Sequence, residues 1–442
     1  MRLPAMNAFA RTTALLACVG LAVAASPVAA AVPGFGDLHD FCSQAQCADG
    51  EYPAAPLEAD AAGDLFGTTA LGGADGWGTI FELVPRKKAG YKYKVLHSFC
   101  GEANCTDGSD PQSGLVIDTA GNLYGTTKFG GAQNGGTVFE LVRRDEGKLK
   151  ILHSFCAQGA ACADGSAPMY DGLTYQGAGS GTPYDGVSPL YGTTIYGGEN
   201  NAGYSGTVYG IAPRKNGKTW KETIVWQFCS ETNCADGSQP HNGLVMDSVG
   251  DLYGVAFAGG NSSNDGVIFE LSPGRSGWTE TVLHDFCGAA NCADGANPES
   301  PLLADNGGFA GAASSGGAHG GGALFFLVPD GTNSQYADTY DFCSLAECTD
   351  GSGPMGRIAP DAEGDLFGTA LTGGDPNYSR GVVYELTTQR TLDVLHIFCA
   401  GGDCADGEWP VGGVTLDASQ DIFGTASEGG SYSEGVIFEQ TP

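Results

Sequence analysis

The sequence predicts an all-β fold: a seven-bladed β-propeller of four-stranded antiparallel blades, with the ring closed by the N-terminal strand. Three observations lead to this prediction. A segment of about 57 residues occurs seven times, which is the signature of a repeat architecture. Each copy holds four short strand-like segments separated by turn residues, without a helical period. The first copy begins with a fourth strand, and the last copy ends after three. Four antiparallel strands per repeat are typical of a propeller blade.

The N-terminus has the features of a secretory signal. Arg2 and Arg11 supply a positive region, residues 13–25 form a short apolar stretch, and residues 29–31 offer a small-residue cleavage site. We assign residues 1–31 to a signal peptide. We therefore expect an exported protein in the periplasm, at the cell surface or outside the cell. No apolar run reaches the roughly 18 residues of a membrane helix, so we expect no transmembrane segment.

The repeat domain is expected over residues 36–442. Its copies start near residues 38, 96, 152, 225, 283, 339 and 395. In the second copy, strands are predicted at 114–118, 123–127 and 136–141, and a variable linker then leads to a fourth strand at 151–155. A flat β-solenoid is the alternative, but its rungs usually have shorter periods and suit four hairpin-like strands poorly.

Repeated aromatic residues and glycines predict packing between blades. A phenylalanine precedes the first cysteine of every copy, at Phe41, Phe99, Phe155, Phe228, Phe286, Phe342 and Phe398. We assign these side chains to the core. Two copies deviate: the third carries an insertion at 177–188, and the fifth has Gly308–Gly311 where the others have Asp-Leu-Tyr-Gly. Irregular loops on a regular scaffold often carry function, and sequence drift is the alternative.

The phase of the repeats predicts ring closure. Leu38–Phe41 matches the fourth-strand segment Leu96–Phe99, whereas the C-terminal segments 413–416, 421–426 and 435–440 lack a fourth strand. An open array would leave both edges unpaired. In a closed ring the N-terminal strand completes the seventh blade beside residues 435–440.

The cysteines are typical of an exported, disulfide-bonded chain. Of fifteen cysteines, Cys18 falls in the signal peptide and fourteen form one pair per copy. The predicted disulfides are Cys42/Cys47, Cys100/Cys105, Cys156/Cys162, Cys229/Cys234, Cys287/Cys292, Cys343/Cys348 and Cys399/Cys404. Zinc is the alternative, but it needs two pairs to meet, and a ring of repeats holds them apart.

An Asp-Gly pair follows each second cysteine. Its aspartates are Asp49, Asp107, Asp164, Asp236, Asp294, Asp350 and Asp406. These loops and the Gly-Gly loops belong to one face of a propeller. The functional interpretation is a ring of oxygen ligands for Ca²⁺ or for sugar hydroxyls. The structural interpretation is a turn in which the aspartate bonds the nearby backbone. Because the aspartate is present in all seven copies, this interpretation is favoured.

Histidines recur before the Phe-Cys pair at His39, His97, His153, His284 and His396. A catalytic histidine usually stands alone, so five copies favour a structural role. His241 and His319 are single loop histidines without a partner that the sequence identifies.

The formal net charge is −31, which argues against a nucleic-acid partner. Most lysines and arginines lie on the linkers between the third and fourth strands, on the face opposite the cysteine loops. We therefore expect an acidic face at the cysteine loops, with a glycan or a surface protein as its partner. Charge on solvated loops is the plainer account.

The motifs Phe-Gly-Thr-Thr, Gly-Gly and Gly-Thr-Val-Phe-Glu-Leu resemble those of the GloVer tandem-repeat family of exported bacterial proteins. The resemblance covers the chain after the signal peptide. It implies export and a repeat protein of the cell-surface type, and it supplies no catalytic residue.

No Gly-x-Ser-x-Gly, His-Glu-x-x-His, phosphate-loop or dinucleotide motif is present. The leading hypothesis is a monomeric, non-enzymatic exported protein that binds a partner or scaffolds at the cell surface, with no cofactor other than Ca²⁺. The rival hypothesis is a propeller hydrolase or lyase acting on polysaccharide. An acidic pair in the central funnel would favour the enzyme, and a ring of equivalent residues there would favour binding.

Overall fold

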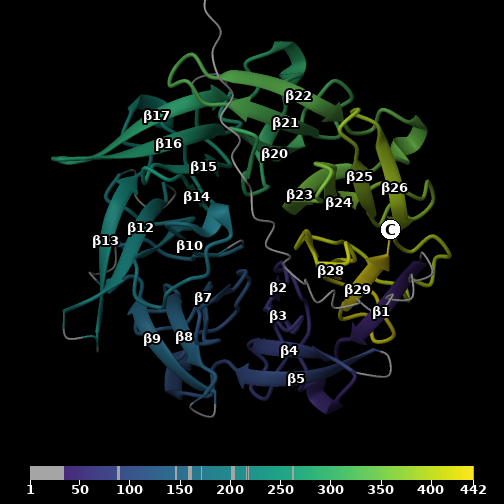
Figure 1. The fold of residues 1–442 in the computed structure, drawn as a ribbon, viewed down its shortest axis with the longest axis horizontal. Coiled ribbons are helices and arrows are strands. Elements are labelled where there is room, and N and C mark those ends of the chain that lie inside the picture. The colour runs from purple at the N-terminus through teal and green to yellow at the C-terminus, as the bar shows by residue number, and fades with distance from the viewer. Residues whose placement is uncertain are drawn as a thin grey trace, which may run out of the picture. The chain divides into compact units, whose positions relative to one another are not determined.

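The computed structural model describes residues 34–86, 90–144, 147–157, 162–170, 172–200, 205–215, 217, 219–260 and 263–441. The signal peptide predicted over 1–31 lies outside this range. Residues Pro33–Pro442 form one compact unit. In this unit, seven antiparallel sheets are arranged around a centre as a seven-bladed propeller (Figure 1), which confirms the predicted fold class.

The first three blades follow the chain in order. Blade 1 contains β2 (Glu58–Ala59), β3 (Leu65–Thr69), β4 (Thr79–Pro85) and β5 (Tyr91–Ser98). Blade 2 contains β6 (Val116–Ile117), β7 (Leu123–Thr127), β8 (Thr137–Val142) and β9 (Lys148–Ser154). Blade 3 contains β10 (Thr174–Tyr175), β11 (Leu190–Thr194), β12 (Thr207–Pro213) and β13 (Trp220–Gln227). The innermost strand of blade 2 is shorter than predicted, because its entry segment bonds to the neighbouring blade rather than to β7.

The next three blades repeat the pattern. Blade 4 contains β14 (Val245–Met246), β15 (Leu252–Ala256), β16 (Val267–Gly274) and β17 (Gly277–Asp285). In blade 5 the inner strand is split into β18 (Ala296–Pro298) and β19 (Leu303–Asp305), followed by β20 (Gly308–Ser315), β21 (Ala323–Val328) and β22 (Gln335–Asp341). Blade 6 contains β23 (Ser352–Pro360), β24 (Leu366–Thr372), β25 (Val382–Leu386) and β26 (Leu392–Ile397).

Blade 7 joins the two ends of the described chain. Its strands are β27 (Val414–Leu416), β28 (Ile422–Ala426), β29 (Val436–Thr441) and the N-terminal β1 (Gly34–Asp40). Strand β1 pairs antiparallel with β29 from Gly34↔Thr441 to Asp40↔Val436, and the purple and yellow strands lie together in Figure 1. The closure predicted from the repeat phase is therefore confirmed. Strand β1 begins earlier than predicted, because Phe35 packs on Phe438 and His396.

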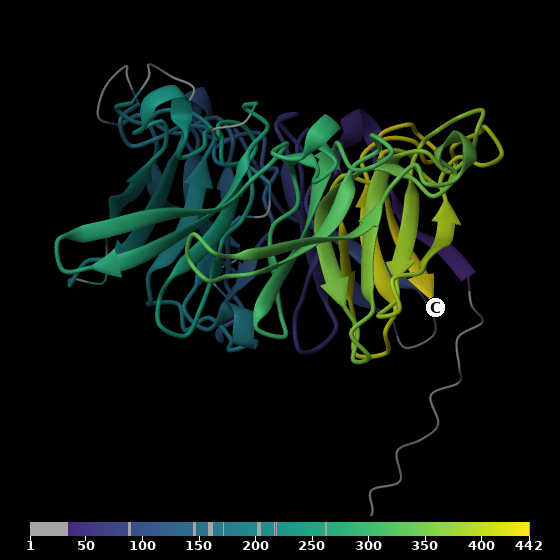
Figure 2. The ribbon, with the colours of Figure 1, turned by 90° about the horizontal axis from the view of Figure 1, so that it is seen from above.

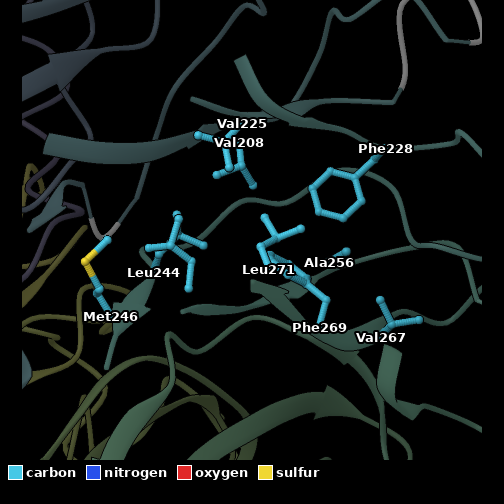
Figure 3. Packing of buried hydrophobic residues seen from close by; sticks show 10 residues of the cluster. Val208, Val225, Phe228, Leu244, Met246, Ala256, Val267, Phe269 and Leu271 are labelled. Carbon is cyan, nitrogen blue, oxygen red and sulfur yellow. The ribbon is translucent and has the colours of Figure 1, made fainter. Parts of the chain in front are cut away.

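The hydrophobic core lies between neighbouring blades. Seven clusters of buried side chains occur among the described residues, one at each junction of two blades. At the junction of blades 3 and 4, Val208 and Phe228 pack with Leu244, Phe269 and Leu271 (Figure 3). No blade buries its apolar faces alone, so each depends on both neighbours.

The insertion of the third copy extends the core between blades 2 and 3. It contains the short 3-10 turn η3 (Ala178–Ser180). Its Tyr184 is fully buried, with ring centroids 5.2 Å from Tyr124 and 4.9 Å from Tyr175. The insertion therefore packs on the blades and contributes to their junction.

The proline after each Asp-Gly pair packs against a glycine of the preceding blade. A Cβ added to Gly435, where φ is +99°, would lie 2.5 Å from Cδ of Pro53, so this contact requires glycine. The same contact recurs at Gly78/Pro111, Gly136/Pro168, Gly206/Pro240, Gly266/Pro298, Gly322/Pro354 and Gly381/Pro410. The residue before the proline can add a backbone bond, as from Tyr52 N–H to the Glu434 carbonyl (3.0 Å).

The seven predicted disulfides are all present, and each lies within one loop between an outer strand and the next inner strand. They join Cys42 to Cys47, Cys100 to Cys105, Cys156 to Cys162, Cys229 to Cys234, Cys287 to Cys292, Cys343 to Cys348 and Cys399 to Cys404.

Five of these loops share one conformation. Each holds a 3-10 turn that ends at the second cysteine, whose N–H donates to the carbonyl three residues earlier, as from Cys47 to Gln44 (3.0 Å). These turns are η1 (Ala45–Cys47), η2 (Ala103–Cys105), η4 (Thr232–Cys234), η5 (Ala290–Cys292) and η6 (Ala346–Cys348).

The loop that ends at Cys404 differs from these five, because Cys404 does not end a 3-10 turn. The loop before Cys162 is one residue longer, with a sequence separation of 6 instead of 5. In the loop before Cys404, Gly402 N–H instead donates to the Cys399 carbonyl (3.0 Å), so the chain turns earlier.

Cys162 and Cys404 nevertheless occupy the position that the repeat predicts. The Cys162 carbonyl accepts Gly165 N–H (2.8 Å) and Gly198 N–H (3.0 Å). The Cys404 carbonyl accepts Gly407 N–H (3.0 Å) and Gly430 N–H (2.8 Å). The disulfide prediction therefore holds at Cys162 and Cys404, although the loop that ends at Cys404 turns earlier.

The cysteine loops share one face of the propeller with the Gly-Gly loops between the second and third strands, as predicted. Gly73 N–H donates to the Cys47 carbonyl (2.9 Å), and Gly131 N–H donates to the Cys105 carbonyl (2.9 Å). We call this the cysteine-loop face. Figure 2 shows the strands running between this face and the opposite one.

The opposite face is mixed in charge rather than basic. The basic linkers lie there beside the turns between first and second strands, and these turns are rich in aspartate. Arg143 illustrates the result, because its guanidinium lies 3.7 Å from Asp60 and also pairs with Glu82. The polarisation expected from the lysine and arginine positions is therefore reduced by neighbouring carboxylates.

Candidate functional site

The repeated aspartates hold the disulfide loops in shape. The Asp49 carboxylate is fully buried and accepts bonds from Ser43 N–H (3.0 Å), Ser43 Oγ (2.6 Å) and Gln44 N–H (3.2 Å). In the other copies the carboxylate accepts a backbone N–H from Gly101, Ala157, Ser230, Gly288, Ser344 or Cys399. Six of the seven aspartates are at most 9% exposed, and the Asp406 side chain is 27% exposed.

The repeated histidines lie against these aspartates. The Nε2 atom of His39 is 3.2 Å from Asp49 Oδ2, and the same pairing joins His97/Asp107, His153/Asp164, His284/Asp294 and His396/Asp406. Where the histidine is replaced by Tyr340, its hydroxyl donates to Asp350 (2.7 Å). Burial lowers the pKa of His39, although the Asp49 carboxylate opposes that shift. These contacts support the structural role predicted for the five histidines.

Ca²⁺ binding by the aspartates stays a prediction of the sequence. Among the described residues, two groups bring three potential ligand atoms together, and both include a disulfide: Cys42 and Cys47 with Glu51, and Cys287 and Cys292 with Asp265. The aspartate oxygens already accept N–H groups, which favours the turn interpretation.

Thermal unfolding curves recorded in Ca²⁺ and in a chelator separate the two interpretations, and the turn interpretation predicts that the curves coincide. A ligand that binds only the folded state raises the melting temperature in proportion to the logarithm of its excess. A higher melting temperature in Ca²⁺ would favour the metal interpretation.

A second position of the outer strand carries tyrosine in blades 1 and 5 and glutamate in blades 3 and 4. The hydroxyls of Tyr93 and Tyr336 donate to the carbonyls of Asp49 and Asp294. Glu280 has the same register in blade 4, since Leu271↔Glu280 corresponds to Leu83↔Tyr93. Its Oε1 atom is buried without a hydrogen-bond partner among the described residues. Burial, together with the charges of Asp236 and Glu231, raises the pKa of Glu280 to about 8.

Stability is expected to fall between about pH 5 and about pH 9 because of Glu280. Its folded-state pKa lies above the unfolded value, so the folded state holds an additional proton, and stability is lost as pH rises toward about 8. After discounting for partial exposure, we expect a loss of about 2 kcal/mol. Urea unfolding at both pH values should show this loss in the native chain and a smaller one in Glu280→Gln. The exposed Glu363→Gln is the control, and equal losses in all three proteins would contradict the assignment.

The centre of the ring holds a cavity of about 250 Å³ with a mixed polar and apolar lining, to which all seven blades contribute. We call it the hub cavity. Its lining includes the residue that follows the repeated proline in six blades: Ala54, Gln112, His241, Glu299, Met355 and Val411. Blade 3 contributes Tyr170. The flanking Asp-Gly and proline are the same in all seven copies, so the repeat keeps its scaffold and varies the side chains that face the hub.

Aromatic and hydrogen-bonding groups meet in the hub cavity. The His241 ring stacks on Phe257, with centroids 4.7 Å apart, and lies 5.8 Å from the Tyr170 ring. Burial lowers the pKa of His241 to about 4, so its imidazole is neutral at neutral pH. Burial also raises the pKa of Glu299. Burial and then the Glu299 charge raise the pKa of Tyr170 to about 12, so its hydroxyl keeps its proton.

Both basic side chains of the cavity have acidic partners. Lys128 Nζ lies 4.0 Å from Asp110, and Arg357 donates to Glu58 at 3.1 Å. Arg357 belongs to blade 6 and Glu58 to blade 1. This ion pair therefore connects two blades that lie on either side of blade 7. A Cβ at Gly413 would collide with the Arg357 backbone, and glycine there allows the close approach.

The sequence did not identify this site, although it flagged His241 as a single histidine. Its lining is neither the ring of equivalent residues nor the acidic pair considered above. Glu299 is the carboxylate among the lining residues of the described chain. One feature of the sequence could have revealed the site. The residue after each repeated proline differs between copies that otherwise agree.

The fold and the site define a class: a seven-bladed β-propeller with disulfide-closed loops and a cavity at its hub. The chain belongs to the Gloeobacter/Verrucomicrobia repeat family, which matches residues 28–189 and 297–442. This confirms the resemblance seen in the repeat motifs. A comparison with curated proteins finds no match. No helix among the described residues is long and apolar enough to cross a membrane.

Several solved structures are similar to the chain at low sequence identity. PorZ, an essential bacterial surface component of the type-IX secretion system of Porphyromonas gingivalis, is 11% identical with a TM-score of 0.46, over 89% of this chain and 46% of that one. A Mycobacterium tuberculosis puromycin-hydrolyzing peptidase is 12% identical with a TM-score of 0.43, over 90% and 53%. A Trypanosoma rangeli sialidase in complex with sialic acid is 9% identical with a TM-score of 0.41, over 81% and 56%. The chain spans about half the length of these proteins.

Proposed function

We propose that the protein is an exported binding protein that takes a neutral saccharide into the hub cavity. The observation that carries the proposal is the contrast between a repeated scaffold and a hub lined by six different residue types at one repeat position. Such a contrast is expected where one asymmetric ligand is bound, because each hydroxyl of a sugar needs its own partner.

The chemistry of the lining suits a sugar. Tyr170 and His241 offer aromatic surface, and Gln112, Asn242 and Glu299 offer donors and acceptors. The Asn242 amide nitrogen is buried and has no hydrogen-bond partner among the described residues, so a ligand hydroxyl would satisfy it. Seven disulfides and the family membership support export.

Calorimetric titration with a panel of neutral oligosaccharides tests the proposal. We expect one class to bind and expect Tyr170→Ala and His241→Ala to weaken binding at least about tenfold. Val249→Ala is the control, because Val249 is 74% exposed on the opposite face. Full affinity in both hub variants, or no binding of any neutral saccharide, would overturn the proposal.

The second candidate is a polysaccharide lyase or hydrolase, and one observation favours it. The His241 Nδ1 atom is buried without a hydrogen-bond partner among the described residues, and a neutral imidazole can act as a general base. Product analysis of the bound saccharide separates the two candidates. New reducing ends that depend on His241 would establish the enzyme, whereas recovery of intact saccharide favours binding.

A further inference from the structure

Exposed apolar side chains lie around the cysteine-loop face; besides Leu345, Tyr378 and Tyr432, four of them lie in three consecutive blades. Leu71 is 40% exposed, Trp77 48%, Phe129 38% and Tyr196 38%. They lie in the loops after the second strands of blades 1, 2 and 3, three consecutive blades. We call these four residues the rim arc. Large apolar side chains that remain exposed on one face mark a surface for a ligand or a partner.

The rim arc is continuous with the hub cavity. The Trp77 carbonyl accepts Asp110 N–H (2.9 Å), and the Asp110 carbonyl accepts Lys128 N–H (3.0 Å). Lys128 lines the hub cavity, and its ammonium lies 5.3 Å from the centre of the Phe129 ring. A ligand that leaves the cavity past Lys128 therefore meets Phe129 and then Trp77.

The arc continues into blade 3 through the same kind of contact. Ala167 N–H donates to the Gly135 carbonyl (2.9 Å), and Ser166 N–H donates to the Tyr196 carbonyl (2.8 Å). Gly135 ends the loop that begins after Phe129, so Tyr196 lies next along the rim.

The hub cavity is too small to hold a long ligand. Its volume of about 250 Å³ is below the roughly 300–1,000 Å³ of typical small-molecule sites. A saccharide that binds only there would bury one end. Sugar rings outside the cavity need flat apolar surfaces, and the rim arc provides aromatic rings separated by glycines such as Gly72 and Gly130.

The negative charge of the protein favours a neutral polysaccharide over an anionic one. The net charge is −31, and both basic side chains of the hub are paired with carboxylates at 4.0 and 3.1 Å. A polyanionic chain would be repelled. A protein partner would favour a broad apolar patch, whereas the rim arc leads through Lys128 into the hub cavity.

From these observations we infer that the ligand is a neutral polysaccharide chain, held by its end in the hub cavity and along the rim arc by stacking on Trp77 and Phe129. This inference rests on the proposed function and specifies its ligand as a polymer.

Affinity electrophoresis with soluble neutral polysaccharides (hydroxyethylcellulose, xyloglucan and galactomannan) tests the inference. Polygalacturonate is the polyanionic comparison. We expect retardation by a neutral polymer and none by polygalacturonate. The double variant Trp77→Ala/Phe129→Ala should lose at least about tenfold in polymer affinity while keeping its affinity for short oligosaccharides. Its melting temperature should match that of the native chain, since both side chains are exposed.

The outcomes separate the two proposals. If polymer affinity survives in the double variant but falls in Tyr170→Ala, the rim arc is wrong and the hub function stands. If polymer affinity falls in the double variant but not in Tyr170→Ala, the hub function is wrong. Retardation by polygalacturonate alone, or a protein partner that depends on Trp77 without polymer binding, would overturn the inference.

Discussion

A chain that starts at Cys42 and so lacks residues 34–41 is expected to melt at least about 6 °C below a chain that starts at Gly34. Strand β1 supplies the outer strand of blade 7, and its loss leaves β29 as an open edge. The deletion also removes Phe41, which is fully buried in the cluster between blades 7 and 1. A buried phenylalanine alone contributes about 3–5 kcal/mol.

The size of the expected effect comes from closure as well as from contacts. In a ring each blade is covered on both sides, and removing β1 uncovers Phe438 and Phe398, on which Phe35 packs. The lost contacts and ladder bonds together exceed about 5 kcal/mol. Differential scanning calorimetry of the two chains measures the effect, and Phe41→Ala should fall between them. Equal melting temperatures would show that β1 does not stabilise the closed ring.

The fold could be predicted because its information is local and repeated. Four strands, their turns and the phase of the copies are visible in one repeat, and the unmatched segments at Leu38–Phe41 and 435–440 then require closure. The inner strand of the second copy was predicted too long. Segment 114–118 becomes β6 (Val116–Ile117), because Gly114 N–H bonds across to the Tyr170 carbonyl of the next blade (2.9 Å). A single repeat does not reveal such contacts.

The disulfide loops show the same limit on a smaller scale. The cysteine pairs could be read from their spacing, and all seven form. The repeat did not reveal that the chain reaches Cys404 without the 3-10 turn of the other copies. An earlier turn at Gly402 accounts for the difference.

The site was less accessible to sequence reasoning. The pairing of His39 with Asp49 could have been found, because histidine and aspartate keep nearly the same spacing in five copies. The hub cavity could not be placed in advance, because Tyr170, His241 and Glu299 meet only when the inner segments of three blades converge. Residues that repeat turned out to build the scaffold, and the residues that break the repeat line the cavity.

The variant Asp49→Ala is expected to destabilise the folded protein by about 3 kcal/mol. The Asp49 carboxylate is fully buried, and it accepts N–H groups from Ser43 and Gln44 beside the His39 ring. Alanine removes these hydrogen bonds, and each contributes about 1.5 kcal/mol because its acceptor is charged. Urea unfolding of native and variant chains measures the difference.

The matched control is the same substitution in the blade where the carboxylate is most accessible. The Asp406 carboxylate occupies the equivalent position and its side chain is 27% exposed, whereas Asp49 is fully buried, so the removal of Asp406 deletes fewer buried contacts. We expect Asp406→Ala to cost less than half as much as Asp49→Ala. Equal costs would mean that burial of the carboxylate does not set the effect. A Ca²⁺-dependent difference between native chain and Asp49→Ala would point to a metal instead. Because both aspartates follow the second cysteine of their copy at the same spacing, the expected difference must come from burial, which the ring imposes and that spacing does not encode.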